Sequence, residues 1–412
     1  MSVAHYRERI ERNSIRRRRI LIAPSEYPDI RDPLKFNGNW AEEQVRAIAD
    51  HHDVAVAYPV LTTDGDRGIE RLDYHGVPTL IVNYRHVRKT WISPYVFAVW
   101  KGLREAREWM EPELVHAHGL YPAGFAAALI GGALRIPVVI TEHWGRLRER
   151  AADRRWMRAV LRYTLRRATK IVAVSRFSAN EMIELEPRCS PEVVPNIVAD
   201  IFQPPSAAAP SRRAGEIEIL FVGSIRGYRK GLDVLLPALR AYLDMPGALR
   251  CRLSVIGEGV KRAEYEDLAR RLGLQNQVAF LGNRSREGVA LAMAACDLFV
   301  MPSRYETFGV VYVEAMACGK PVIACSGGPA EEIIPPWAGE LVPPGDHTGL
   351  ARAIHRVTSN LDGFDRARIS EYAKKMFGPE AVVSALSEVY ERAISSTARV
   401  SKRLTQAAAS RA

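Results

Sequence analysis

One stretch of this 412-residue chain, residues 302–334, constrains its fold most strongly. An apolar segment at residues 297–301 leads into a loop that ends at Gly309, and a helical pattern then runs to Gly319, a residue suited to a left-handed helix cap. A second apolar segment follows at residues 321–324. Strand, loop, helix and strand make one βαβ unit, and parallel sheets of such units bind ligands at the carboxyl ends of their strands. The pattern therefore predicts an α/β fold with a ligand site in this loop.

The loop and the helix after it carry groups suited to a phosphorylated sugar. Backbone N–H groups of Phe308, Gly309 and Val310 lie at a helix N-terminus, which attracts phosphate, and glycine permits close approach. Glu306 and Glu314 can accept hydrogen bonds from hydroxyls, Glu306 from the sugar and Glu314 from a ribose. The alternative is that Glu306 only begins the helix and Glu314 is solvated. The spacing alone favours that alternative, but the loop, the cap and the Gly-Gly pair that follow favour a ligand site.

This stretch resembles the donor site of retaining glycosyltransferases of family 4. From Glu306 to Val322 the chain reads E-T-F-G-V-V-Y-V-E-A-M-A-C-G-K-P-V. The family signature is E-G-F-G-x-x-x-x-E-A-M-A-C-G-x-P-V, so Thr307 stands where glycine is usual. The similarity extends over about residues 20–394 and is more specific in the C-terminal half. It implies the GT-B fold, two Rossmann-like domains facing across a cleft, with a C-terminal helix that crosses back to the first domain.

The resemblance implies a second phosphate-binding loop after the strand that ends near residue 222. Members of the family hold the diphosphate with an arginine after one glycine and a lysine before another, and Lys230 matches the lysine. Ser224 stands where the arginine is usual, so Arg226 or Arg229 would have to replace it. A guanidinium grips phosphate through two hydrogen bonds, whereas an ammonium acts as a point charge. The alternative is a basic surface turn.

In the N-terminal half the resemblance points to His118 and Gly38. His118 ends a short apolar strand, where the family histidine hydrogen-bonds the transferred sugar near its 6-hydroxyl; a lone histidine can equally be structural. Gly38 lies in the first strand-to-helix turn, where the alternative is a surface loop capped by Asn39. His116 is expected to face the core, and His143 is a weaker candidate for the site.

The length predicts two domains, since about 200 residues suffice for each. The clearest linker is a segment rich in proline and alanine at residues 203–215. The expected organisation is a basic flexible arm (1–18), an N-terminal acceptor domain (19–205), a C-terminal nucleotide-sugar donor domain (206–378), a crossover helix (379–396) and a disordered tail (397–412).

The net charge of +11 is concentrated in two segments, residues 7–19 and 146–170, which implies anionic partners. A helix expected over residues 151–168 mixes arginines with Trp156 and Tyr163, a composition suited to anionic lipid. The alternative is an ordinary helix with a solvated basic face. No nucleic-acid partner is predicted, and no apolar run reaches the ~18 residues that a bilayer-spanning helix needs.

The sequence predicts no cofactor and no essential metal. The five cysteines form no C-x-x-C pair, which indicates reduced thiols in a cytoplasm; the chain would be cytoplasmic, or peripheral on the inner face of the membrane. Residues 64–66, with two aspartates, read as a turn. Residues 257–259, G-E-G, also read as a turn, because Arg262 occupies the place of the third glycine in a dinucleotide fingerprint.

The predicted activity is that of a retaining hexosyltransferase of polysaccharide biosynthesis, which moves a sugar from a nucleotide diphosphate-sugar to a hydroxyl of a glycan or lipid-linked acceptor. A UDP-sugar is the first expectation for the donor and GDP-mannose the second. The alternatives are a nucleotide-sugar epimerase or a phosphorylase on the same fold, or a non-catalytic GT-B-like module that binds anionic lipid or a partner. The sequence leaves open the donor base and sugar, the acceptor, the linkage and the oligomeric state.

Overall fold

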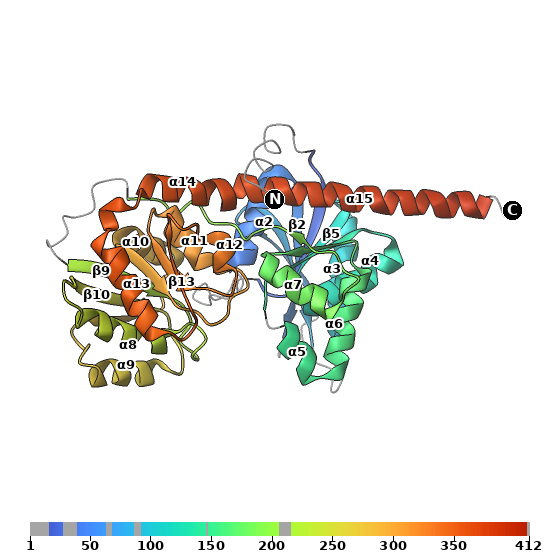
Figure 1. Cartoon of the computed structure of the whole chain (residues 1–412). Coiled ribbons are helices and arrows are strands. Elements are labelled where there is room, and N and C mark those ends of the chain that lie inside the picture. Colours follow the sequence, from blue (N-terminus) through green and yellow to red (C-terminus); the bar gives the residue numbers. More distant parts are fainter. Residues whose placement is uncertain are drawn as a thin grey trace. The chain divides into compact units, whose positions relative to one another are not determined.

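The computed structural model describes residues 16–27, 39–62, 68–85, 92–145, 147–205 and 216–409 (Figure 1). The chain divides into two compact units. The first unit comprises residues 1–197 together with residues 379–412, and the second comprises residues 198–378. Each unit is built on a largely or wholly parallel sheet, so the α/β prediction is confirmed.

The sheet of the first unit has the strand order β3-β4-β2-β1-β5-β6-β7-β8 among the described residues. Neighbouring strands pair in parallel except β3 and β4, which form an antiparallel pair. The strands are β1 (Arg19–Pro24), β2 (Asp53–Leu61), β3 (Ile69–Tyr74), β4 (Val77–Tyr84), β5 (Leu114–His118), β6 (Val138–Glu142), β7 (Lys170–Ala173) and β8 (Glu192–Val193).

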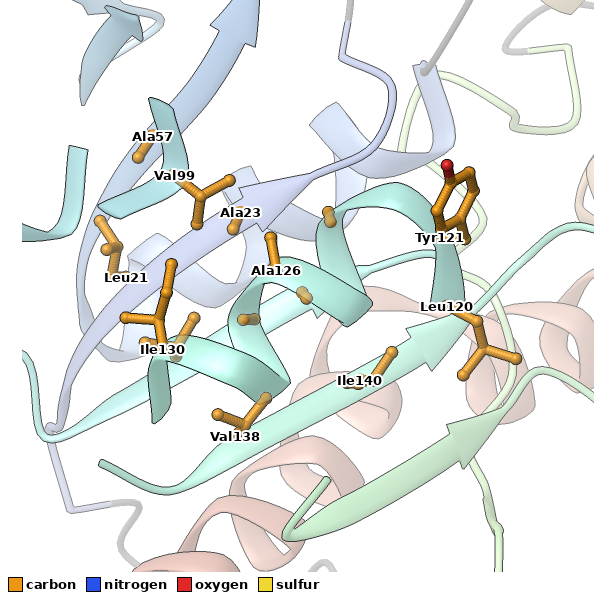
Figure 2. Packing of buried hydrophobic residues seen from close by; sticks show 14 of the residues in the cluster. Leu21, Ala23, Ala57, Val99, Leu120, Tyr121, Ala126, Ile130, Val138 and Ile140 are labelled. Atoms are coloured by element: carbon orange, nitrogen blue, oxygen red, sulfur yellow. The ribbon is translucent and has the colours of Figure 1, made fainter. Parts of the chain in front are cut away.

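Helices cover both faces of this sheet. Successive side chains of a strand point to opposite faces, so each face presents its own set of side chains for a layer of helices to pack against. Ile20 and Ile22 of β1 pack with α2 (Asn39–His51) and α15 (Pro379–Ala409), whereas Leu21 and Ala23 pack on the other face. Figure 2 shows part of that second cluster, in which Ile130 lies with Leu21 and Val138. The helices on this face are α3 (Ile92–Arg107), α4 (Phe125–Leu134), α5 (Leu147–Asp153), α6 (Arg155–Arg167) and α7 (Arg176–Leu185), and the π-helical turn η1 (Leu120–Gly124) precedes α4.

The sheet of the second unit is parallel throughout the described residues, with the order β11-β10-β9-β12-β13-β14. Its strands are β9 (Glu216–Val222), β10 (Arg250–Ile256), β11 (Val278–Gly282), β12 (Leu298–Met301), β13 (Val322–Cys325) and β14 (Gly339–Val342). Its helices are α8 (Leu232–Leu243), α9 (Arg262–Arg271), α10 (Arg286–Ala295), α11 (Val310–Ala317), α12 (Ala330–Ile333), α13 (His347–Ser359) and α14 (Arg366–Phe377), with the short 3₁₀ turn η2 (Leu361–Gly363) before α14.

The βαβ unit predicted from residues 302–334 is present as β12, α11 and β13. α11 ends as expected, because Gly319 has a φ of 72°. The N–H of Gly319 donates to the carbonyl of Met316 at 2.8 Å, and the N–H of Lys320 donates to Ala315 at 3.0 Å. These two bonds form the Schellman motif, which satisfies carbonyls at the end of the helix.

The last helix, α15, is longer than the sequence predicted. It begins at Pro379, a residue suited to the first helical position, and buries Val382 and Leu386 in the core of the first unit. It continues to Ala409, although we expected the helix to end near residue 396 and residues 397–412 to be disordered. No glycine or proline follows Pro379, so the sequence contains no signal that would stop the helix.

Candidate functional site

The sheet of the second unit has a switch point between β9 and β12. The chain proceeds from β9 to β10 and β11 on one side and then crosses to β12 on the other. Loops that leave two such strands diverge, and the crevice between their carboxyl ends is where open α/β sheets bind ligands. The loops at this position are residues 223–231 and residues 302–309, the two that the sequence predicted to hold a diphosphate.

Lys230 and Glu306 meet across these two loops. The Lys230 ammonium lies 2.5 Å from Glu306 Oε1, and the two side chains are 17% and 14% exposed. The loops are further joined by a hydrogen bond of 2.8 Å from the Arg304 N–H to the Arg229 carbonyl. The structure thus brings together a cation and a carboxylate that lie 76 positions apart in sequence.

Gly231 allows this approach of the two loops. Its φ is 77°, in the left-handed region, and a Cβ atom there would lie 2.0 Å from the carbonyl oxygen of Pro302. Any side chain at this position would therefore push the lysine loop away from residues 302–309.

Glu314 is buried, which rules out the alternative that it is a solvated helix residue. Its side chain is 4% exposed, and Arg286 at the start of α10 approaches Glu314 Oε1 to 3.3 Å. The Arg286 guanidinium also lies over the ring of Phe202, at 5.2 Å from its centroid. Sequence reasoning missed Arg286, because only the packing of α10 beside α11 identifies it.

The start of α11 is held from beneath by aromatic rings. Phe308 is buried and packs edge-on against Phe377 with ring centroids 5.7 Å apart. Gly309 has a φ of 86°, and the Tyr312 hydroxyl donates to the carbonyl of Met301 at 3.0 Å. Val310 is the first residue of the helix. The first N–H groups of a helix have no partner within it, so those at the start of α11 can bind an anion.

Arg226 and Arg229, the two candidates for the missing family arginine, lie exposed on the same loop as Lys230, as does Ser224. The guanidinium of Arg304 is engaged elsewhere, in an ion pair of 2.7 Å with Asp233. Residues 257–259, predicted to be a turn, are irregular instead, and a turn begins only at Val260; Gly259 packs against the backbone of Ile225.

The first unit has its own switch point, between β1 and β5. His118 ends β5 there, and its carbonyl accepts a hydrogen bond of 2.9 Å from the N–H of Ser25, which follows β1. The His118 side chain has no exposed surface, so contact with a sugar requires neighbouring groups to move. Gly38 lies outside the described residues, as do residues 64–66.

Three buried histidines, His116, His118 and His143, lie together near the switch point of the first unit. His118 Nδ1 is 3.2 Å from His143 Nε2, and His143 Nδ1 is 2.8 Å from Asn196 Oδ1. His116 faces the core as expected and contacts the hydroxyl of Tyr390 at 2.8 Å. Burial lowers the pKa of His118 to about 3 and the pKa values of His116 and His143 well below their ordinary range. All three rings are therefore neutral at pH 7.

These histidines make the stability of the chain sensitive to acid. Since their pKa values are depressed in the folded protein, the unfolded chain takes up protons first as the pH falls below about 6.5. Each histidine would lower the free energy of unfolding by about 2 kcal/mol near pH 5. Glu142, whose pKa is raised by burial, works in the opposite direction. Calorimetry between pH 7.5 and 5 should show a falling Tm, with a smaller slope in His116→Gln and an unchanged slope in the exposed control His347→Gln.

Sequence reasoning also missed Glu142, the fully buried last residue of β6. Its carboxylate accepts hydrogen bonds of 2.6 Å from the N–H groups of Leu120 and Trp144. It therefore ties the loops after β5 and β6 together around His118 and His143. Within the described ranges there is no group of three or more metal-ligating side chains, and no helix there is long and apolar enough to cross a membrane.

Known proteins resemble both units. The family model for glycosyl transferases group 1 matches residues 204–376, and the model for glycosyltransferase family 4 matches residues 38–200. An uncharacterized glycosyltransferase of Methanocaldococcus jannaschii is 27% identical over 82% of this chain and 90% of its own length. The glycogen synthase of Mycobacterium tuberculosis is 30% identical over 70% of this chain and 71% of its own length.

Solved structures show the same fold. Sucrose-phosphate synthase from Thermosynechococcus elongatus matches with a TM-score of 0.73 and 21% identity, over 92% of this chain and all of the other. Anabaena HepE in complex with UDP-glucose matches with a TM-score of 0.67 and 21% identity, over 91% of this chain and 99% of the other. The chain therefore belongs to the glycosyl transferases of group 1, family 4, and is a glycosyltransferase with the GT-B fold.

Proposed function

We propose that this enzyme is a retaining glycosyltransferase that moves a sugar from a nucleotide diphosphate-sugar to a hydroxyl of a glycan or lipid-linked acceptor. The observation that carries the proposal is the Lys230–Glu306 pair, which lies at the β9/β12 switch point beside the N-terminus of α11. A UDP-sugar is the first candidate for the donor, supported by the structural similarity to HepE, which was solved with UDP-glucose. GDP-mannose is the second.

In this proposal, binding of the donor breaks the ion pair between Lys230 and Glu306. Lys230 moves from Glu306 to the diphosphate, where its charge stabilises the departing phosphate together with the N–H groups of Phe308, Gly309 and Val310. Arg226 or Arg229 supplies a second positive charge to the same diphosphate. These positive charges stabilise the negative charge that develops on the departing diphosphate, so we expect no essential metal.

The two glutamates then bind hydroxyls. Glu306, released from its lysine, accepts hydrogen bonds from the sugar, and Glu314, oriented by Arg286, accepts from the ribose. The bond between the sugar and the diphosphate breaks through an oxocarbenium-like state; the acceptor hydroxyl attacks from the same face and gives its proton to the departing phosphate oxygen. His118 contacts the transferred sugar, and Gly38 belongs to the acceptor side. Product analysis separates this reaction from its alternatives, because an epimerase needs no acceptor and a phosphorylase needs inorganic phosphate.

Binding of the donor can be measured without knowledge of the acceptor. A ligand that binds only the folded state raises Tm, by an amount that grows with its affinity. In a thermal-shift series, UDP and UDP-sugars should give the largest increases, and Lys230→Ala should abolish most of the increase. Larger shifts with GDP and GDP-mannose would select the second donor, and no shift with any nucleoside diphosphate would contradict the proposal.

We also propose that the basic surface of α6 holds the enzyme against anionic lipid. Arg155 and Arg158 are exposed there, beside Trp156, whose side chain is 44% exposed. Arg162 and Arg166 are already paired with Glu186, at 2.9 and 2.7 Å, so they add little charge to this surface. An exposed tryptophan between arginines that form no ion pair with a described residue is suited to the boundary between headgroups and acyl chains.

Vesicle sedimentation tests this surface. The wild type should bind vesicles that contain phosphatidylserine, bind phosphatidylcholine vesicles little, and lose binding as salt is raised. The double variant Arg155→Ala/Arg158→Ala should bind about 10–30-fold more weakly, since each arginine contributes about 1 kcal/mol near such a surface. A control of equal formal charge is Arg270→Ala/Arg271→Ala on α9, whose arginines are exposed but pair with Asp267; it should bind as the wild type does. Equal binding by all three proteins would contradict the assignment.

A further inference from the structure

We propose that Asn196 and His143 are positioning residues that fix the tautomer of His118, so that His118 carries its proton on Nδ1 and presents a lone pair at Nε2. The three side chains form one chain of contacts, from Asn196 Oδ1 to His143 Nδ1 at 2.8 Å and from His143 Nε2 to His118 Nδ1 at 3.2 Å. They come from three places in the sequence: the end of β5, the residue after β6 and the loop after β8.

The positions of the protons follow from the chemistry of each atom. An amide oxygen can only accept a hydrogen bond, so the proton of the Asn196–His143 contact lies on His143 Nδ1. A neutral imidazole has one N–H, so His143 Nε2 is an acceptor. His118 Nδ1 must then be the donor, and His118 Nε2 is left unprotonated. Burial keeps both rings neutral, since it lowers the pKa of His118 to about 3 and that of His143 well below its ordinary range.

His116 provides a contrast on the same strand. Its Nε2 is 2.7 Å from the Thr141 hydroxyl and its Nδ1 is 2.8 Å from the Tyr390 hydroxyl. A hydroxyl can donate or accept, so these contacts allow either tautomer of His116. The tautomer of His118, by contrast, is fixed through His143, which contacts the Asn196 amide, and His118 is the histidine at the switch point.

The consequence for the reaction rests on the proposed function. A lone pair at His118 Nε2 accepts a hydrogen bond, so it selects a sugar that carries a hydroxyl at the contacting position. An analogue with hydrogen or a methyl ether there cannot donate to it. The reverse tautomer would present an N–H and would tolerate the methyl ether, because an ether oxygen accepts hydrogen bonds.

The tautomers can be observed directly in the full-length protein labelled with ¹⁵N-histidine. Long-range ¹H–¹⁵N correlation spectra, assigned with His118→Gln and His143→Gln, should show protonated Nδ1 and unprotonated Nε2 on both rings. Asn196→Leu removes the amide and should restore protonated Nε2 in part of the His118 population. Thr141→Val removes a hydrogen-bond partner of His116 and none of His118, so it should leave the His118 spectrum unchanged.

A His118 signal from protonated Nε2 in the wild type would overturn the proposal, as would an unchanged tautomer in Asn196→Leu. Kinetics test the sugar contact separately: with the proposed donor, Asn196→Leu should raise the donor KM more than it lowers kcat. Normal kinetics together with a changed tautomer would refute the contact of His118 with the sugar and leave the tautomer assignment standing. Failure of every nucleotide sugar to react would refute the proposed function, and the spectra would still report on the tautomer.

Discussion

Replacement of Lys230 with alanine should lower kcat by about 10²–10³-fold, the usual loss when one group that stabilises developing negative charge is removed. The lysine is largely buried against Glu306 at the switch point of the second unit. In the proposed reaction, the diphosphate of the Lys230→Ala variant would depart beside the carboxylate of Glu306 with no intervening cation. The loss should therefore fall on the chemical step as well as on donor binding.

The measurement is initial-rate kinetics with the preferred donor, together with calorimetry of each variant. Lys375→Ala removes an exposed lysine of α14 in the same unit and should leave kcat unchanged. Lys230→Arg keeps the charge in a different geometry and should retain part of the activity. Glu306→Ala should also lose most of its turnover, with its fold intact. Wild-type turnover in either alanine variant would refute the role assigned to that residue.

The βαβ unit could be predicted from sequence because its signals are local. Apolar runs mark β12 and β13, a helical pattern marks α11, and Gly319 supplies the left-handed residue that its cap requires. Such signals act over a few residues, so no knowledge of the rest of the fold is needed. The C-terminus was predicted wrongly because we ended the last helix near residue 396 without a local stop signal. The helix α15 continues to Ala409.

The contacts within the site could not be predicted in the same way, because they depend on the order of strands in the sheet. Lys230 meets Glu306 only because β12 lies next to β9, and nothing within either motif specifies that pairing. The salt bridge of Arg286 with Glu314 depends likewise on α10 packing beside α11. The role of Asn196 emerges only once three separate loops meet. Resemblance supplied the candidate residues Lys230, Glu306 and Glu314, whereas the contacts that they make could be found only in the structure.

Replacement of Gly231 with alanine should both destabilise the second unit and inactivate the enzyme. The left-handed backbone costs an L-residue about 1–2 kcal/mol, and relief of an overpacked contact costs about 1–3 kcal/mol more. Here the added Cβ would lie 2.0 Å from the Pro302 carbonyl oxygen, which belongs to the opposite loop and cannot rotate away as a side chain would. We expect Tm to fall by roughly 5–15 °C. Displacement of Lys230 by about 1 Å would lower turnover about 10²-fold as well.

Gly227→Ala is the matched control, since it adds the same methyl group to the same loop. No atom lies within 4 Å of a Cβ at Gly227, and its φ lies outside the left-handed range, so Tm and kcat should stay near wild-type values. The comparison separates contact between the loops from the general cost of altering a glycine. If Gly231→Ala retained full activity and stability, Lys230 and Glu306 would not depend on this contact for their positions. If both variants lost stability equally, flexibility of the loop rather than its packing against Pro302 would be what glycine provides.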